Sequence, residues 1–148
     1  MDDIDKKILK NLQKNARMTI SDLSAEISLS MPAISERLKK LEASGVIKQY
    51  TVILDPAMLN KHLMALMYVQ LENPTQGDSF ASFVKEEVEI KECFYITGEF
   101  DYSLKIVTES TKTLELLLNR IKNQPGILKT QTIVVLSSIT DNPSIIPN

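Results

Sequence analysis

The feature that most constrains this chain is a pair of short helical patterns joined by a tight turn between residues 19 and 45. Thr19, followed three residues later by Asp22, predicts the start of a short helix through a capping box. Ser30 predicts a second start with Pro32 in its first turn, and Gly45 predicts its left-handed end. Two short helices in this order, the second polar and basic on its outer side, are typical of a helix-turn-helix.

A further helix is expected over residues 4–14, before this pair. Asp2 and Asp3 are candidate N-caps, and Asn15 is a candidate end. The apolar residues in between recur at helical spacing: Ile4, Ile8, Leu9 and Leu12. This helix would complete a three-helix bundle, which we place in a DNA-binding domain over residues 1–50.

The rest of the chain alternates between strand-like and helix-like patterns. We expect a strand from Val46 to Leu54 that leaves the DNA-binding domain and leads into a β-containing linker, which we place over 51–63. Further strands are expected over 64–72, 90–97, 102–108 and 127–139. Two amphipathic helices lie between them, one with Phe80, Phe83, Val84 and Val88 and one with Leu114, Leu117, Leu118 and Ile121. The order βαββαβ predicts a ferredoxin-like domain over 64–140, followed by a tail over 141–148, and the fold class is α+β.

The predicted strands are apolar on both faces in places, as in the stretch Ile133 to Leu136. One face of the sheet packs on the two helices, and the other needs a partner. A second copy of the same sheet is the simplest partner, so we expect a symmetric dimer.

The charge is divided unevenly along the chain, whose formal net charge is −2. Residues 1–50 hold nine basic against seven acidic side chains, and the remainder holds eight against twelve. A basic front and an acidic back suit a DNA-reading head on a body that does not touch DNA. The first residues lack a signal-peptide pattern, and the single cysteine suits a reducing compartment, so we expect a cytoplasmic protein.

Catalytic and metal-binding signatures are sparse in the sequence. One histidine, His62, and one cysteine, Cys93, cannot build a zinc site, because structural zinc typically takes four ligands. No glycine-rich phosphate loop and no nucleophile elbow occur. We therefore expect no enzyme, no metal and no cofactor.

These residues resemble the Lrp/AsnC, or feast/famine, transcription regulators over nearly the whole chain. The resemblance rests on Asp5-x-x-Ile8-Leu9 and on the run from Leu29-Ser30-x-Pro32 through Arg37-Leu38 to Gly45-Val46-Ile47. It rests also on Thr97-Gly98-Glu99-Phe100-Asp101-Tyr102, which is similar to the effector-loop signature of the family. The resemblance implies a DNA-binding dimer that assembles further, commonly into an octamer, and that often responds to an amino acid.

If the second helix of the pair enters the major groove, its N-terminal and outward residues face the DNA. The candidate DNA-binding residues are Ser30, Met31, Pro32, Ala33, Ser35, Glu36, Arg37, Lys39 and Lys40. Arg37 could contact guanine or phosphate, whereas Lys39 and Lys40 suit phosphate. The alternative is a solvated charged surface, and for Glu36 an intrahelical pair with Lys40 is favoured over contact with a base.

The second candidate site is the loop between two of the predicted strands. The candidate effector-binding residues are Thr97, Gly98, Glu99, Phe100, Asp101 and Tyr102. Asp101 could face the ammonium group of an amino acid, and Gly98 would let the ligand approach main-chain donors. The alternative is an ordinary hairpin turn in which Gly98 supplies a positive φ and Asp101 bonds to the backbone of the turn.

Three functions are compatible with this sequence. The leading hypothesis is a sequence-specific regulator that binds operator DNA as an oligomer of dimers, modulated by an amino acid or related metabolite. The second is a nucleoid-organising protein that wraps DNA with low sequence specificity. The third is a small enzyme on a ferredoxin-like dimer, which the absence of a concentrated His/Glu/Cys cluster disfavours.

Overall fold

The structure is a computed structural model in which residues 1–147 are described. The chain divides into two compact units. The first holds Met1–Ile53 together with the C-terminal residues from Thr140 onward, and the second holds Leu54–Ile139. The chain therefore passes from the first unit into the second and returns to the first.

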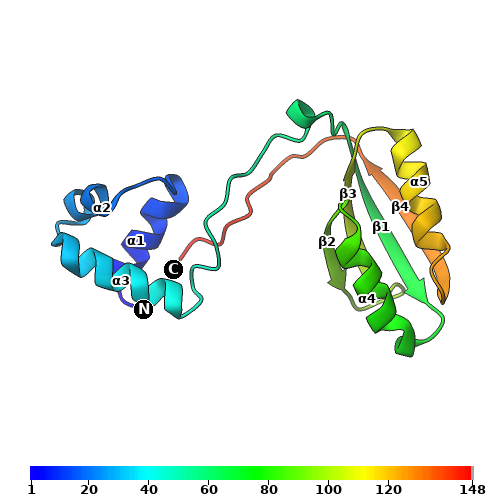
Figure 1. Ribbon diagram of the computed structural model, residues 1–148, viewed down its shortest axis with the longest axis horizontal. Helices are drawn as coiled ribbons and strands as arrows, with labels where there is room; N and C mark the ends of the chain where they lie inside the picture. Colours follow the sequence, from blue (N-terminus) through cyan, green and yellow to red (C-terminus); the bar gives the residue numbers. More distant parts are fainter. Residues whose placement is uncertain (148) are drawn as a thin grey trace. The chain divides into compact units, whose positions relative to one another are not determined.

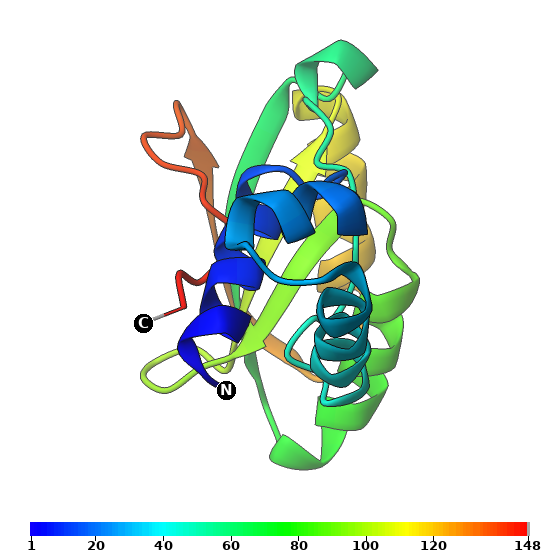
Figure 2. The same cartoon turned by 90° about the vertical axis from the view of Figure 1, so that its left-hand side faces the viewer.

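Three helices build the first unit: α1 (Asp3–Lys14), α2 (Ile20–Ile27) and α3 (Met31–Ala43). A capping box starts α2 at Thr19, as the sequence predicts, and a second one, with Asp5, starts α1 at Asp2, one of its two candidate N-caps. The helices pack around a common core of five buried residues: Ile8, Leu9, Leu23, Ile34 and Leu41. Figure 2 brings this bundle to the front, and it confirms the predicted helix-turn-helix with its preceding helix.

The turn between α2 and α3 is three residues long and tightly bonded. Ser28 adopts the left-handed conformation with φ of 59°, which ends α2 abruptly. The Ser24 hydroxyl donates to the Leu29 carbonyl over 2.6 Å and holds the turn in place. Beyond α3, Gly45 has φ of +76°, which confirms the predicted left-handed end.

The strand predicted from Val46 to Leu54 is wrong. These residues form no strand, and the linker beyond them contains only a short 3-10 turn, η1 (Ala57–Leu59). A strand needs a neighbour to pair its backbone groups, and nothing in the described chain pairs with this segment. Its β-branched composition is therefore left exposed, with Val52 77% and Ile53 67% accessible.

The second unit is one antiparallel sheet with two helices. Its elements are β1 (Leu63–Leu71), η2 (Pro74–Gln76), α4 (Gly77–Glu86), β2 (Ile90–Tyr95), β3 (Tyr102–Thr108), α5 (Thr111–Lys122) and β4 (Ile127–Val135). The strand order is β2-β3-β1-β4, and every neighbouring pair is antiparallel. Figure 1 shows α4 and α5 over the same face of the sheet, which confirms the predicted ferredoxin-like arrangement.

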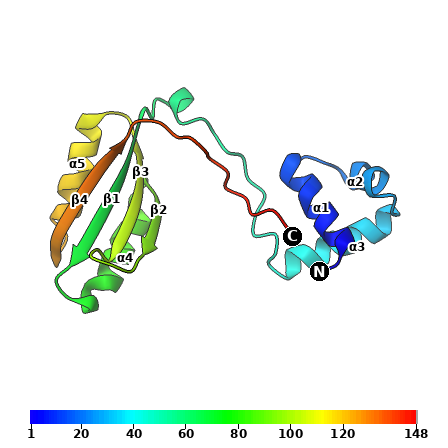
Figure 3. The same ribbon diagram turned by 180° about the vertical axis from the view of Figure 1, so that it is seen from behind.

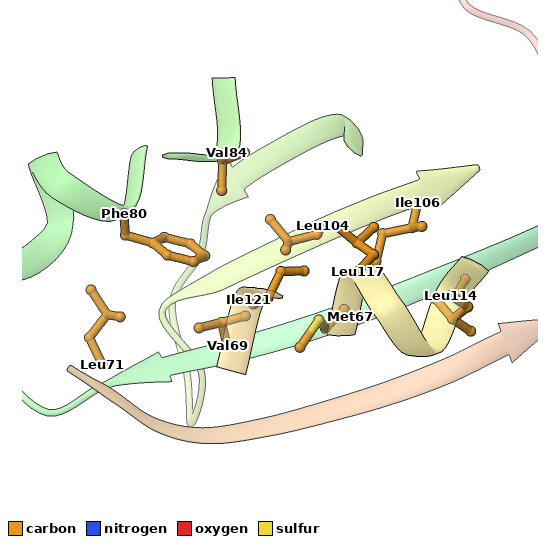
Figure 4. Packing of buried hydrophobic residues seen from close by; sticks show 11 residues of the cluster. Met67, Val69, Leu71, Phe80, Val84, Leu104, Ile106, Leu114, Leu117 and Ile121 are labelled. Carbon is orange, nitrogen blue, oxygen red and sulfur yellow. The ribbon is translucent and has the colours of Figure 1, made fainter. Parts of the chain in front are cut away.

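The core of this unit lies between the sheet and its two helices. In β1 the buried residues alternate along the strand, so Ala65, Met67 and Val69 all face the helices. Phe80 and Val84 of α4 and Leu114, Leu117 and Ile121 of α5 close over them (Figure 4). This packing fixes both ends of the sheet, from which the loops of the second unit project.

Several element ends differ from the sequence prediction, and two of them leave a large apolar residue exposed. Val88 is 80% exposed, because α4 ends at Glu86 and Glu87 is already extended. The last strand ends at Val135 instead of reaching Ile139, and Leu136 is 97% exposed. Val88 and Leu136 each extend the apolar pattern of the element before them, but each lies beyond the end of that element and is not covered by a neighbour.

The other face of the sheet carries no helix (Figure 3). The strand registers place apolar side chains across part of it in rows, beside the ion pair of Lys105 and Glu92. Met64 lies between Val107 and Val135, and Leu66 lies beside Ile133. Ile133 and Phe94, which also belong to this face, are 45% and 55% exposed.

None of the helices in residues 1–147 combines the length and the apolar character needed to span a membrane.

Candidate functional site

The α3 helix presents two different sides. Ile34 and Leu41 are buried in the bundle, and Pro32, Glu36 and Lys39 are exposed. The remaining candidate DNA-binding residues lie between or beside them: Ser30, Met31 and Lys40 are exposed, and Ala33, Ser35 and Arg37 are partly buried. The helix therefore offers solvent a surface built from its first turns and from one side of its length.

The N-terminus of α3 leaves polar groups free to bind an anion. Ser30 is the N-cap residue, but its side chain makes no capping hydrogen bond. The first backbone N–H groups of a helix have no partner within the helix, and the helix dipole favours a negative charge there. Ser30 and these amides together suit a phosphate oxygen.

Glu36 and Lys40 form the intrahelical pair that the sequence favours. Lys40 Nζ lies 2.8 Å from Glu36 Oε1, and both side chains are largely exposed. The hydrogen bond from Lys40 lowers the pKa of the Glu36 carboxyl below its usual value. Lys39, one residue earlier, has no ion pair among residues 1–147 and is the free cation of this surface.

Arg37 has a different environment from the one expected for a DNA-contacting residue. Its Nη1 lies 2.7 Å from Asp2 Oδ2 and 2.7 Å from Asp5 Oδ1, so the guanidinium joins α3 to the start of α1. The two hydrogen bonds that Arg37 donates, first to Asp2 and then to Asp5, raise the pKa of Arg37. The sequence analysis missed this pair, although the spacing of Arg37 from Ile34 and Leu41 places it toward the bundle.

The second candidate site, the loop between β2 and β3, has the positive φ at Gly98 of the alternative interpretation, but its Asp101 side chain bonds to β1 and not to the turn. Gly98 has φ of +111°, a conformation that L side chains rarely adopt. The Ile96 N–H donates to the Asp101 carbonyl over 2.8 Å. Asp101 also accepts a 2.7 Å hydrogen bond from the Leu71 N–H at Oδ2, which ties the loop to the end of β1.

Glu99 and Phe100 turn toward β1 and β4. Glu99 pairs with Lys129 of β4, and the Lys129 ammonium lies 5.4 Å from the centre of the Phe100 ring. Phe100 in turn packs on Tyr68, with ring centres 5.7 Å apart. These contacts fix the loop to the strands and engage the Glu99 carboxylate.

A surface hollow of about 280 Å³ lies on the helix side of this loop. Its lining brings together Asp101 and Tyr102 from the predicted set with Tyr95 of β2 and Asp78 of α4. Thr97, Gly98, Glu99 and Phe100 are not among the lining residues. Burial is the main cause that raises the pKa of Tyr102, whose ring packs on Phe80 at 4.9 Å and on Tyr95 at 5.3 Å.

Two carboxylates and two phenol rings around one hollow have the chemistry to hold an ammonium group. Asp78 was missed by the sequence analysis, because only the fold brings the first turn of α4 beside the loop. Within residues 1–147, no cluster of three His, Cys, Asp or Glu side chains is placed to hold a metal ion.

The two units correspond to two known domain families. The family model for winged helix-turn-helix DNA-binding domains matches residues 1–48. The family model for the Lrp/AsnC ligand binding domain matches residues 64–145, which is more than half of the chain. The chain is a member of the Lrp/AsnC family.

Relatives along the full length agree with this assignment to Lrp/AsnC. The HTH-type transcriptional regulator YezC of Bacillus subtilis is 38% identical over 144 residues, covering 97% of this chain and 99% of the relative. The leucine-responsive regulatory protein of Haemophilus influenzae is 34% identical, covering 94% and 86%. A transcriptional regulator of Neisseria meningitidis, solved as a complex with L-Met, superposes with a TM-score of 0.93 at 32% identity, covering 98% of this chain and 96% of that one.

This Lrp/AsnC chain is therefore a DNA-binding transcription regulator with a ligand-binding domain. Its relatives are transcription regulators, and the leading hypothesis of the sequence analysis is confirmed at this level.

Proposed function

We propose that this regulator binds operator DNA as a homodimer that assembles further, with an octamer as the expected form, and that an amino acid modulates the binding. The observation that carries the proposal is the presence of a DNA-binding unit and an Lrp/AsnC ligand-binding unit in one chain. The protein acts by binding, without catalysis, in the cytoplasm.

In this proposal α3 enters the major groove. Ser30 and the free N–H groups of the first turn bind one phosphate, and Lys39 binds another. Met31, Pro32, Ala33 and Ser35 face the base edges, and Glu36 stays paired with Lys40 on the same surface. Arg37 belongs to the predicted DNA-binding set, but the pair that it makes with α1 suggests a separate role, which is developed below.

A second copy of the chain covers the bare face of the sheet. The apolar rows on this face, with Met64 and Leu66 at their centre, would otherwise remain in contact with water. Burial of apolar area stabilises by about 25 cal/mol per Å², and stable interfaces bury about 1,200 Å² or more. A self-complementary sheet face gives a closed symmetric dimer.

The effector site is proposed at the loop of residues 97–102 and the hollow beside it. The Neisseria relative was solved with L-Met, and the Haemophilus relative is named for leucine, which supports an amino acid as the ligand class. Asp101 and Asp78 can face the ammonium group, while Tyr95 and Tyr102 offer ring faces and hydroxyl groups.

The test is fluorescence anisotropy with a labelled duplex from upstream of the protein's own gene, beside a random duplex of equal length, over a salt series. We expect binding that weakens steeply with salt and prefers the upstream duplex by about 1,000-fold or more. Equal binding to both duplexes would favour the nucleoid-organising alternative. Failure to bind either duplex at low salt would overturn the proposal.

A further inference from the structure

The position of Arg37 on α3 sets it apart from the other cations of the helix. With 3.6 residues per turn, Arg37 points about 60° away from Ile34 and about 40° away from Leu41. Both of these residues are buried in the bundle. Lys39 lies about 140° from Ile34 by the same geometry and is exposed. Arg37 thus projects beside the packed side of α3, away from the side that Lys39 occupies.

The partners of Arg37 are part of the start of α1. Asp2 is the N-cap residue: its Oδ1 accepts from the Asp5 N–H over 2.9 Å, while its Oδ2 accepts from Arg37 over 2.7 Å. Asp5 closes the capping box with Oδ2, which accepts from the Asp2 N–H over 3.0 Å, and uses Oδ1 for Arg37. Each carboxylate therefore uses one oxygen to cap α1 and the other to accept a hydrogen bond from Arg37 of α3.

The packing around this pair makes it more than a loose surface contact. The Asp5 side chain is 17% exposed and the Arg37 side chain 28% exposed, whereas the Asp2 side chain is 54% exposed, so the shielded contact is the one with Asp5. A guanidinium that bridges two carboxylates fixes direction as well as distance, because its N–H groups are held in a rigid plane. The pair therefore restrains both the rotation of α3 about its axis and its position along α1.

We propose that Arg37 is a positioning residue for DNA recognition: it locks α3 to the capping box of α1 and does not itself contact DNA. The inference rests on the proposed DNA-binding function. Without the lock, α3 samples other orientations, and the apparent affinity falls in proportion to the fraction of molecules that remain competent to bind.

Electrostatics separates this role from direct contact with DNA. Asp5 is an acidic group in the DNA-binding unit, and removal of a negative charge ordinarily strengthens attraction to the phosphate backbone. A positioning role for Arg37 predicts that Asp5→Asn weakens DNA binding, because the substitution weakens the ion pair with Arg37 and leaves α3 less well oriented. The sign of this single change therefore discriminates between the two roles.

The experiment is a double-mutant cycle on the full chain with Arg37→Ala, Asp5→Asn and the double variant. Affinity for the labelled upstream duplex is measured by anisotropy over a salt series. We expect each single change to weaken binding by about fivefold, the double variant to be no weaker than Arg37→Ala, and the salt slope to stay unchanged. Arg37→Lys should recover part of the loss, because the charge is retained without the planar double contact.

Lys39→Ala is the matched control. It removes an exposed cation of the same helix that has no ion pair among residues 1–147, so it should lower the salt slope by about one phosphate contact and show no coupling to Asp5→Asn. The inference is overturned if Arg37→Ala lowers the salt slope as Lys39→Ala does, or if Asp5→Asn tightens binding.

The same cycle measured by thermal unfolding does not depend on DNA. Coupling between Asp5 and Arg37 in melting temperature supports the lock even if the upstream duplex proves not to be bound, in which case only the proposed function fails. Additive effects of the two changes on melting temperature would contradict the lock whatever the DNA result.

Discussion

Asp101 has two roles: it makes hydrogen bonds that stabilise its loop, and it lines the proposed effector site. Its carboxylate accepts from the Leu71 N–H, and its backbone N–H donates to the Val69 carbonyl over 2.9 Å. Leu71 is buried, so its N–H needs that acceptor. The same carboxylate also lines the hollow in which we propose the effector's ammonium group.

Two substitutions at Asp101 separate these roles. Asp101→Ala removes the acceptor of a buried N–H and should destabilise the protein by about 1–3 kcal/mol. Asp101→Asn keeps a carbonyl oxygen in place of the carboxylate, so its free energy of unfolding should stay close to that of the wild type, while any amino-acid response is lost. Urea unfolding and amino-acid-induced thermal shifts measure the two effects. A full amino-acid response in Asp101→Asn would remove this carboxylate from the proposed site.

Elements of the second unit are joined at one end by an ion-pair cluster. Arg120, in the last turn of α5, donates from Nε and Nη2 to Glu87 over 2.9 Å each and from Nη2 to Glu89 over 3.3 Å. Glu89 also accepts from the hydroxyl of Thr108, the fully buried last residue of β3. The connection from α4 to β2 is thereby fastened to both α5 and β3.

This cluster predicts a dependence of stability on pH. The hydrogen bond from Arg120 is the main cause that lowers the pKa of Glu87 below its usual value. A carboxyl with a lowered pKa in the folded state contributes stability above its unfolded pKa of about 4.3, and this contribution is lost as the pH falls through the folded pKa. Glu87→Gln should therefore be less stable than the wild type at pH 7, by about 1 kcal/mol or less because nearly half of Arg120 is exposed.

Urea midpoints at neutral pH and at about pH 3 measure this difference. The difference in urea midpoint between the wild type and Glu87→Gln should be smaller at about pH 3 than at neutral pH. Glu86→Gln is a suitable control, because Glu86 makes no ion pair among residues 1–147 and its substitution should leave the midpoint nearly unchanged at both pH values. If the difference in urea midpoint stays constant down to acid pH, the loss of stability in Glu87→Gln does not arise from the charge of Glu87.

The sequence predicted the helices well where their ends depend on hydrogen bonds and backbone conformations within a few residues. Asp2 and Thr19 cap the starts of α1 and α2, Ser30 marks the start of α3 without a side-chain cap, and Gly45 follows its end. The segment from Val46 to Leu54 shows the limit, because a β-branched composition does not supply a neighbouring strand. The hollow near Asp78 depends on contacts between distant residues, which no local pattern reports. Arg37 was within reach of the sequence, through its angular position relative to Ile34 and Leu41.

At the scale of the whole molecule, the chain connects its two units by two segments. After β4 the C-terminal residues return to the first unit, where Gln13 Nε2 donates over 2.6 Å to Ser144 Oγ and over 2.6 Å to the Ile145 carbonyl. The bare face of the sheet is the surface that we propose for assembly. Its apolar rows favour the dimer that the strand patterns of the sequence predict.

The dimer is tested by Leu66→Asp, which places a charge at the centre of the bare face. We expect the variant to sediment as a monomer, because burial of an unpaired carboxylate costs several kcal/mol. Leu116→Asp, on an exposed position of α5, is the control that should leave the oligomeric state unchanged. Circular dichroism verifies that both variants fold. A Leu66→Asp variant that sediments like the wild type would exclude this face as the dimer interface.

The central claim is that one unit binds DNA and the other senses an amino acid, with the two coupled. The most direct measurement is the affinity for the upstream duplex by anisotropy in the presence of each of the twenty amino acids in turn. The account predicts that at least one amino acid changes the dissociation constant by about fivefold or more, and that DNA changes the affinity for that amino acid by the same factor. Constant DNA affinity across all twenty amino acids would contradict it.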